Sequence, residues 1–138
     1  MKKSTLLAGL LTFSSLVFAS HPDISGNYYF KGNDPFAKVD YEATMVITKT
    51  GDTYQFDWDL GKEYGKYKGT GFYVKGIDNY IPVTLVSLNK EPEADNPYNS
   101  ELQVYKINKD GSLTGAWTFL GKSKLSPVEV CHKVVSKK

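Results

Sequence analysis

Arginine is absent from this sequence of 138 residues, and cysteine occurs only once. Without arginine the chain lacks the side chain best suited to bidentate contacts with phosphate or guanine, so we expect no nucleic-acid binding. A single cysteine excludes an internal disulfide framework. His21 and His132 are the only histidines, too few for a typical zinc site, and we expect neither a metal nor any other cofactor. Beyond residue 19 no stretch approaches the roughly 20 apolar residues that a membrane helix needs, so no membrane span is expected.

Residues 1–19 have the features of an export signal. Two lysines precede an apolar run over residues 6–18, and Val17 and Ala19 have the spacing that signal peptidase accepts. Cleavage after Ala19 removes two lysines and leaves 15 lysines against 15 acidic residues, a net charge of zero. No cysteine sits at the cut, so a lipid anchor is not indicated. We therefore expect a periplasmic or secreted protein with a single domain over residues 20–138.

Alternation of apolar and polar residues predicts an all-β fold. In residues 53–60 aromatic and apolar residues alternate strictly with polar ones, as in a half-buried strand. A similar run over residues 41–48 precedes it, and Lys49-Thr50-Gly51-Asp52 is a turn that joins the two into a hairpin. Six further strands are expected at about residues 26–32, 67–75, 80–88, 101–108, 113–120 and 128–135.

Eight short strands joined mostly by tight turns favour an eight-stranded antiparallel up-and-down β-barrel, because closure removes unpaired sheet edges. A β-sandwich of the same strands is the alternative. A barrel of this size is either filled by its own side chains or holds one small ligand. The aromatic residues are therefore candidates for both core and ligand pocket. The candidate ligand-binding residues are Tyr54, Phe56, Trp58, Tyr67, Tyr73, Trp117 and Phe119.

Patterns that carry catalytic chemistry are weak in this sequence. Asp57 and Asp59 share a strand face at a spacing compatible with a glycosidase pair, but the alternation places both in solvent, where neither pKa is raised as an acid catalyst requires. Cys131 and His132 are adjacent and so face opposite sides of a strand. We expect Cys131 to be a small buried residue, with a reactive thiol as the alternative. No nucleophile elbow, phosphate loop or dinucleotide motif occurs, and we expect no enzymatic activity.

Two polar segments are candidate surfaces. The long connection from Asn89 to Ser100 is acidic, but its spacing does not match a calcium-binding loop, so we interpret it as solvated, with an inhibitory loop as the alternative. The second segment covers residues 62–68 and contains Lys62, Tyr64, Lys66, Tyr67 and Lys68. It either forms a basic, aromatic surface for a partner or protects a strand edge.

Three stretches in order carry a family resemblance. They are Ile24-Ser25-Gly26-Asn27-Tyr28, the run from Ile47 to Tyr54 with Trp58 and Tyr67-Lys68-Gly69-Thr70-Gly71 after it, and Val104-Tyr105-Lys106-Ile107 with Asp110 to Trp117 after it. Over nearly the whole mature chain this order resembles a largely uncharacterised family of small exported bacterial proteins, sometimes labelled fibronectin-binding. The resemblance implies a non-enzymatic binding protein whose partner is a host matrix protein such as fibronectin.

The opening Gly-x-Tyr and the later Leu-x-Gly-x-Trp are also similar to avidin-like and lipocalin-like barrels in architecture. The alternative function is therefore a carrier that holds a small apolar or amphipathic ligand inside the barrel.

The sequence departs from that family at one position. Members carry a cysteine in the first strand and another in the last, close to a glutamate; here Glu129 and Cys131 match the last strand, but Phe30 occupies the first-strand position. The resemblance implies that Phe30 and Cys131 are neighbours where the first and last strands meet. It also implies that the chain forgoes a bridge worth roughly 3 to 5 kcal/mol.

Overall fold

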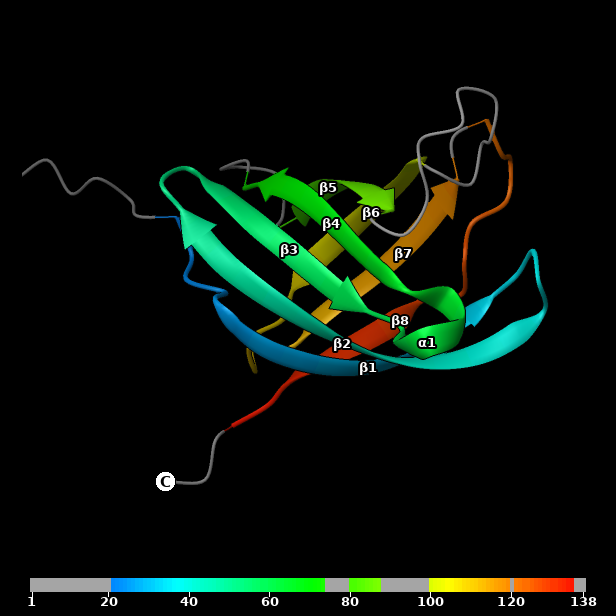
Figure 1. Ribbon diagram of the computed structural model, residues 1–138. Helices are drawn as coiled ribbons and strands as arrows, with labels where there is room; N and C mark the ends of the chain where they lie inside the picture. The colour runs from blue at the N-terminus through cyan, green and yellow to red at the C-terminus, as the bar shows by residue number, and fades with distance from the viewer. Residues whose placement is uncertain (1–20, 74–79, 88–99, 120, 136–138) are drawn as a thin grey trace, which may run out of the picture.

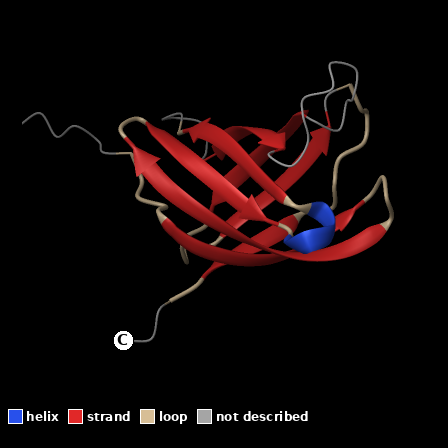
Figure 2. Ribbon diagram, viewed as in Figure 1, coloured by secondary structure: helices blue, strands red, loops and turns tan. Residues whose placement is uncertain are grey.

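The computed structural model describes residues 21–73, 80–87, 100–119 and 121–135. This part of the chain forms eight strands and one short helix (Figure 1). The elements are β1 (Gly26–Asp34), β2 (Val39–Thr50), β3 (Thr53–Asp59), α1 (Gly61–Tyr64), β4 (Lys66–Phe72), β5 (Tyr80–Ser87), β6 (Ser100–Ile107), β7 (Leu113–Phe119) and β8 (Glu129–Lys133). Strands dominate and α1 is a single turn (Figure 2), so the predicted all-β class is confirmed.

The strands form one curled antiparallel sheet in which each strand pairs with the next along the chain. The last strand also meets the first, because Tyr28 pairs with Lys133 and Tyr29 with His132. The order is that of an up-and-down meander, and the sheet wraps around a single interior (Figure 1). The alternative of two packed sheets is therefore wrong, since the eight described strands belong to one sheet.

The predicted strands occur close to their expected positions, with differences at their ends. The hairpin turn between β2 and β3 is confirmed, and Gly51 there has the positive φ of +60° that glycine tolerates. Residues 61–64, expected to be a loop-like link, form α1, which begins where the Gly61 amide donates to Asp59 Oδ1 at 3.0 Å. Within the described residues, no helix has the length and apolar character needed to cross a membrane. The acidic connection over residues 89–99 lies outside the described residues.

The interior is packed mainly with aromatic rings from the inward-facing positions of the strands. Phe56 stacks on Trp58 and on Tyr105, with ring centroids 5.3 and 5.8 Å apart. The register sets Phe56 opposite Gly69 and Tyr54 opposite Gly71, so large rings on β3 face positions without side chains on β4. This complementary pairing of rings with glycines lets the sheet curl tightly around its core.

One end of the interior is covered by residues 21–25, the segment that leads into β1. The Tyr54 hydroxyl donates to the carbonyl of Pro22 at 2.5 Å, and the Tyr28 hydroxyl donates to the carbonyl of Ile24 at 2.8 Å. Ile24 itself is buried. This segment does not reach the other end of the sheet.

The register of β1 and β8, extended by one residue, sets Phe30 opposite Cys131. Both side chains are buried, and Cys131 is a free thiol. Burial raises the pKa of the Cys131 thiol well above its ordinary value, and His132 on the opposite face is exposed. Cys131 is therefore a buried residue with little thiolate character, as the sequence predicts.

Candidate functional site

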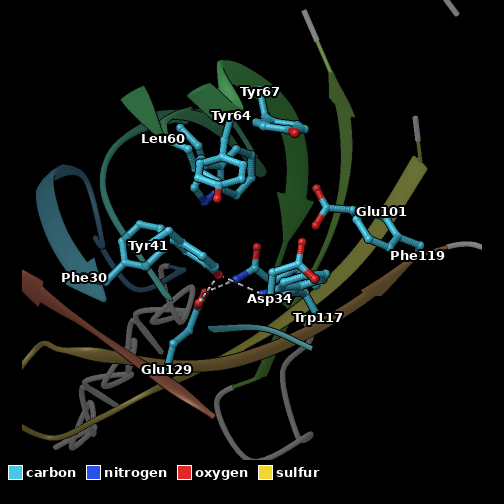
Figure 3. Close-up of a pocket in the computed structure, with 12 residues that line it drawn as sticks. Phe30, Asp34, Tyr41, Leu60, Tyr64, Tyr67, Glu101, Trp117, Phe119 and Glu129 are labelled. Carbon is cyan, nitrogen blue, oxygen red and sulfur yellow. Dashed lines mark hydrogen bonds between the residues drawn. The ribbon is translucent and has the colours of Figure 1, made fainter. Parts of the chain in front are cut away.

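The antiparallel order brings the ends of β1, β3 and β7 and the starts of β2, β4, β6 and β8 to one rim of the sheet, beside α1 (Figure 1). A cavity of about 60 Å³, partly open to solvent, lies at this rim. We call it the rim pocket, and Figure 3 shows the residues around it. Its lining consists of Phe30, Asp34, Tyr41, Trp58, Leu60, Tyr64, Tyr67, Glu101, Gln103, Trp117, Phe119 and Glu129.

Seven of the lining residues are aromatic, and they come from five strands and from α1. The Trp117 ring lies edge-on to the Phe119 ring, with ring centroids 5.2 Å apart. The ring centroids of Tyr41 and Tyr64 lie 6.5 Å apart across the pocket. The labelled rings surround the same space (Figure 3). Rings held by different strands in this way form a rigid apolar wall, because each is fixed by its own packing.

A buried hydrogen-bond network lies at one side of the rim pocket. Glu129 on β8 is only 3% exposed. The Tyr41 hydroxyl donates to Glu129 Oε2 at 2.9 Å, and Gln103 Nε2 donates to Oε1 at 2.6 Å. Trp117 Nε1 in turn donates to the Tyr41 hydroxyl at 2.9 Å. Every carboxyl oxygen of Glu129 therefore has a fixed donor, and the network ties β2, β6, β7 and β8 together.

The pKa of Glu129 is raised to about 7 because burial disfavours its charged form. The hydrogen bonds from Tyr41 and Gln103 act in the opposite direction but do not outweigh burial. The same burial, with Glu129 as a neighbour, raises the pKa of Tyr41 well above its ordinary value. Near neutral pH Glu129 is therefore divided between its neutral and charged forms, and Tyr41 stays a hydrogen-bond donor.

Gly32 on β1 allows Tyr41 to reach this network. The two residues pair directly across the β1–β2 ladder. A Cβ atom at Gly32 would overlap the ring and hydroxyl of Tyr41. The missing side chain thus lets the Tyr41 ring lie across β1 toward Glu129, a close approach that only glycine permits.

A second glutamate, Glu101 at the start of β6, borders the opening of the rim pocket. Burial raises its pKa to about 8, and repulsion by Glu129 and by Asp34 adds to the shift. Asp34 Oδ1 accepts hydrogen bonds from the amides of Phe36 and Ala37 and so holds the turn after β1. Among the described lining residues there are three carboxyl groups and no lysine or histidine, so nothing in that lining offsets their charge.

Trp58 connects the rim pocket to the core beneath it. Its Nε1 donates to the hydroxyl of Tyr105 at 3.1 Å, and Tyr105 is fully buried. Tyr105 fits there because Gly115 on the neighbouring β7 has no side chain, and a Cβ atom at that position would lie 2.7 Å from the ring. The residues beneath Trp58 are therefore closely packed.

The structure brings together four of the seven aromatic residues predicted to bind a ligand: Trp58, Tyr67, Trp117 and Phe119 line the rim pocket. Phe56 lies in the core, stacked on the ring of Trp58.

The other two, Tyr54 and Tyr73, lie at the covered end. The Tyr54 hydroxyl donates its hydrogen bond to the Pro22 carbonyl there, and the ring centroids of Tyr73 and His21 lie 6.0 Å apart. The seven therefore do not share one cavity.

Sequence reasoning missed the polar part of the pocket. Glu101, Gln103 and Tyr105 alternate along β6 and so face the same side. Two polar residues in line with a buried tyrosine are the signal that would have pointed to an interior polar site. Asp34 and Tyr41 carried no comparable signal in the sequence, because their positions at the pocket depend on how β1 and β2 pair.

The outer face of the β3–β4 hairpin carries ion pairs. Asp57 lies 3.2 Å from Lys68 and Asp59 lies 3.0 Å from Lys66; the lysine side chains are largely exposed and the aspartate side chains are partly exposed. The hydrogen bond from Lys66 is the main cause of the lowered pKa of Asp59. These aspartates face solvent, as the alternation predicts.

The predicted basic and aromatic surface on residues 62–68 is divided between two faces. Tyr64 and Tyr67 line the rim pocket, whereas Lys66 and Lys68 form their ion pairs outside. Alternation along β4 causes this separation. The segment therefore does not present its tyrosines and lysines together.

Within the described residues, no group of three or more histidine, cysteine, aspartate or glutamate side chains is arranged to hold a metal ion. No family model matches the sequence, and no curated protein is found as a relative.

Proposed function

We propose that this is an exported, non-enzymatic binding protein that takes a small amphipathic molecule into the rim pocket. The observation that carries the proposal is an aromatic cavity with a fixed polar network, located at the end of the sheet that residues 21–25 leave uncovered. Apolar walls with a few convergent polar groups are the usual composition of a small-molecule site.

The size of the rim pocket limits the ligand. A volume of about 60 Å³ is well below the roughly 300 Å³ at which pockets for drug-sized molecules begin. The pocket is partly open, so a larger molecule places a compact end group inside and keeps the remainder at the rim. Short amphipathic molecules fit this description.

The proposed architecture is the eight-stranded up-and-down barrel of avidin-like and lipocalin-like proteins, with its open end as the binding end. The pairing of β8 with β1 supports this closure. Export rests on the features of residues 1–19. A binding role is favoured over catalysis because the described lining includes no serine, threonine, cysteine, lysine or histidine, and both oxygens of Glu129 already have donors.

Three six-carbon probes that differ only in their head group test the proposal: hexylamine, 1-hexanol and hexanoate. Both tryptophans line the rim pocket, so we expect at least one probe to change the tryptophan fluorescence saturably. Tyr67→Ala removes a pocket ring and should weaken that binding at least about threefold, in the range of a lost aromatic contact. Phe72→Ala is the matched control, because Phe72 lies on the same strand but is 51% exposed on the outer face.

Absence of saturable binding for all three probes would contradict the proposal. Native mass spectrometry of freshly purified protein adds an independent view, because a retained small molecule would appear as a mass shift. A fluorescence change that Phe72→Ala and Tyr67→Ala weaken equally would place binding outside the rim pocket and would count against it as well.

Binding to a host matrix protein such as fibronectin stays a prediction from the family resemblance. Titration of the purified protein with fibronectin tests it directly. Saturable binding at micromolar concentration would support the adhesion function, and its absence would remove it.

A further inference from the structure

We propose that the rim pocket selects a small primary ammonium compound, whose charged head enters the cavity while its hydrocarbon tail leaves through the open rim. This inference rests on the proposed function and adds the chemical class of the ligand. It is carried by the charge, the aromatic lining and the size of the rim pocket.

The charge of the lining favours a cation. Asp34, Glu101 and Glu129 contribute three carboxyl groups to one cavity, and the described lining residues include no basic side chain. On the outer face three acidic side chains have lysine partners: Asp57 and Asp59 pair with lysines on β4, and Glu42 pairs with Lys31. A ligand ammonium group would supply the opposite charge that the rim pocket lacks.

The aromatic lining favours a cation as well. Rings of tryptophan and tyrosine attract an ammonium group placed over their faces. Trp58, Tyr64 and Tyr67 lie on β3, α1 and β4 on one side of the rim pocket, and Trp117 lies on β7 on the other. Figure 3 shows Tyr64, Tyr67 and the Glu101 carboxyl around the same opening. Rings and carboxyl groups together therefore surround the position of the ligand head.

The size of the cavity favours a primary ammonium over a quaternary one. Its volume of about 60 Å³ is well below the roughly 150 Å³ of a cavity that holds benzene. A terminal CH2–NH3+ group is more compact than a trimethylammonium head, so it suits a cavity of this size better. A primary ammonium also has three N–H donors for carboxyl oxygens, and the oxygens of Glu101 accept no hydrogen bond from a described side chain.

Binding of such a cation must depend on pH in a defined direction. Among the described residues, the titratable groups that interact with Glu101 are Glu129, Asp34, Tyr41 and Tyr67, and none of these four is cationic. Because burial and these neighbours raise the pKa of Glu101 to about 8 and burial raises that of Glu129 to about 7, an ammonium ion has to displace a proton near neutral pH. Its affinity therefore rises from pH 6 to pH 9 and falls again as the amine itself deprotonates, around its ordinary pKa of about 10.

The test compares hexylamine with 1-hexanol and hexanoate on the purified protein, by calorimetry or tryptophan fluorescence at pH 6, 7.5 and 9. At pH 7.5 hexylamine is expected to bind at least about tenfold more tightly than 1-hexanol, the ratio that a cation–π contact plus charge attraction gives. Its affinity rises toward pH 9, while that of hexanoate falls. A fourth probe, N-acetyl-lysine methylamide, distinguishes a free amine from a lysine side chain as the source of the ammonium group.

Glu101→Gln keeps the shape of the side chain and removes its charge. We expect this variant to lose most of the preference for hexylamine over 1-hexanol while it still binds 1-hexanol. Glu42→Gln is the matched control, because Glu42 is an exposed glutamate on the outer face, paired with Lys31. It should leave both affinities unchanged.

The outcomes separate the two proposals. Equal affinity for the three head groups, or tightest binding of hexanoate at pH 7.5, would overturn the ammonium selectivity and leave the binding pocket standing. An unchanged preference in Glu101→Gln would overturn it too. Failure of every probe to bind would overturn both proposals.

Discussion

The buried carboxyl of Glu129 predicts that the protein becomes less stable as the pH rises through neutrality. The folded pKa of about 7 lies above the ordinary value of 4.5, so the folded state holds this proton more tightly than the unfolded state between those values. The stabilisation is complete below pH 4.5 and is lost as the pH rises through 7. A rise of the pKa from 4.5 to about 7 corresponds to at most about 3 kcal/mol. Glu101 acts in the same direction up to about pH 8.

Glu129→Gln isolates the contribution of this one group. A glutamine matches the neutral carboxyl in shape, and rotation of the Gln103 amide lets it present its oxygen to the new NH2 group. We expect the variant to equal the natural protein near pH 5 and to exceed it by about 2 to 3 kcal/mol at pH 8. Urea denaturation at the two pH values measures the free energy of unfolding.

Glu42→Gln provides the control for this experiment. Glu42 is exposed, and its hydrogen bond from Lys31 lowers its pKa, so its stabilisation is lost only below about pH 4.5. This variant should follow the natural protein from pH 5 to pH 8. If Glu129→Gln does the same, the argument that Glu129 is protonated in the folded state is refuted.

Three further experiments test the packing of the core, the burial of Cys131 and the role of the outer face. Gly115→Ala places a Cβ atom 2.7 Å from the Tyr105 ring, and overpacking should cost about 1 to 3 kcal/mol in urea denaturation; an unchanged midpoint would argue against the close contact. The thiol of Cys131 is buried, with a raised pKa, so iodoacetamide at pH 8 should label it only after unfolding, and rapid labelling of the folded protein would contradict this placement. Asp59→Asn breaks the exposed pair with Lys66 and should leave stability almost unchanged and hexylamine binding unaltered; a large loss of binding would move the site to the outer face.

The sequence predicted the strands well because alternation reports directly which side of a sheet a residue faces. In β3, Tyr54, Phe56 and Trp58 are buried, and Asp57 pairs with Lys68 outside, as the period of two requires. The same period does not tell which of the two ends of the interior an inward-facing residue lies near. Tyr54 and Trp58 share one face of one strand, yet they lie at opposite ends of the interior. Which end is covered depends on the pairing of the strands and on the path of residues 21–25.

The polar network was less accessible to prediction because its members come from different strands. Tyr41, Gln103, Trp117 and Glu129 meet only after β2, β6, β7 and β8 assemble at one rim. Inward polar residues such as Gln103 can be identified by their position relative to Tyr105 on β6. Their partners cannot, since hydrogen bonds across a curled sheet depend on how strongly it curls. The helix α1 was missed for a similar reason, since a single turn has no hydrophobic period to detect.

The most direct test of a ligand-binding rim pocket is a two-dimensional NMR titration of the two indole Nε1–H signals with hexylamine. Trp58 and Trp117 both line the pocket, and their indoles donate to Tyr105 and Tyr41. The account predicts that both signals move saturably, with one dissociation constant, and that Glu101→Gln weakens this response. Indole signals that stay fixed while backbone amides on the outer face move would contradict it.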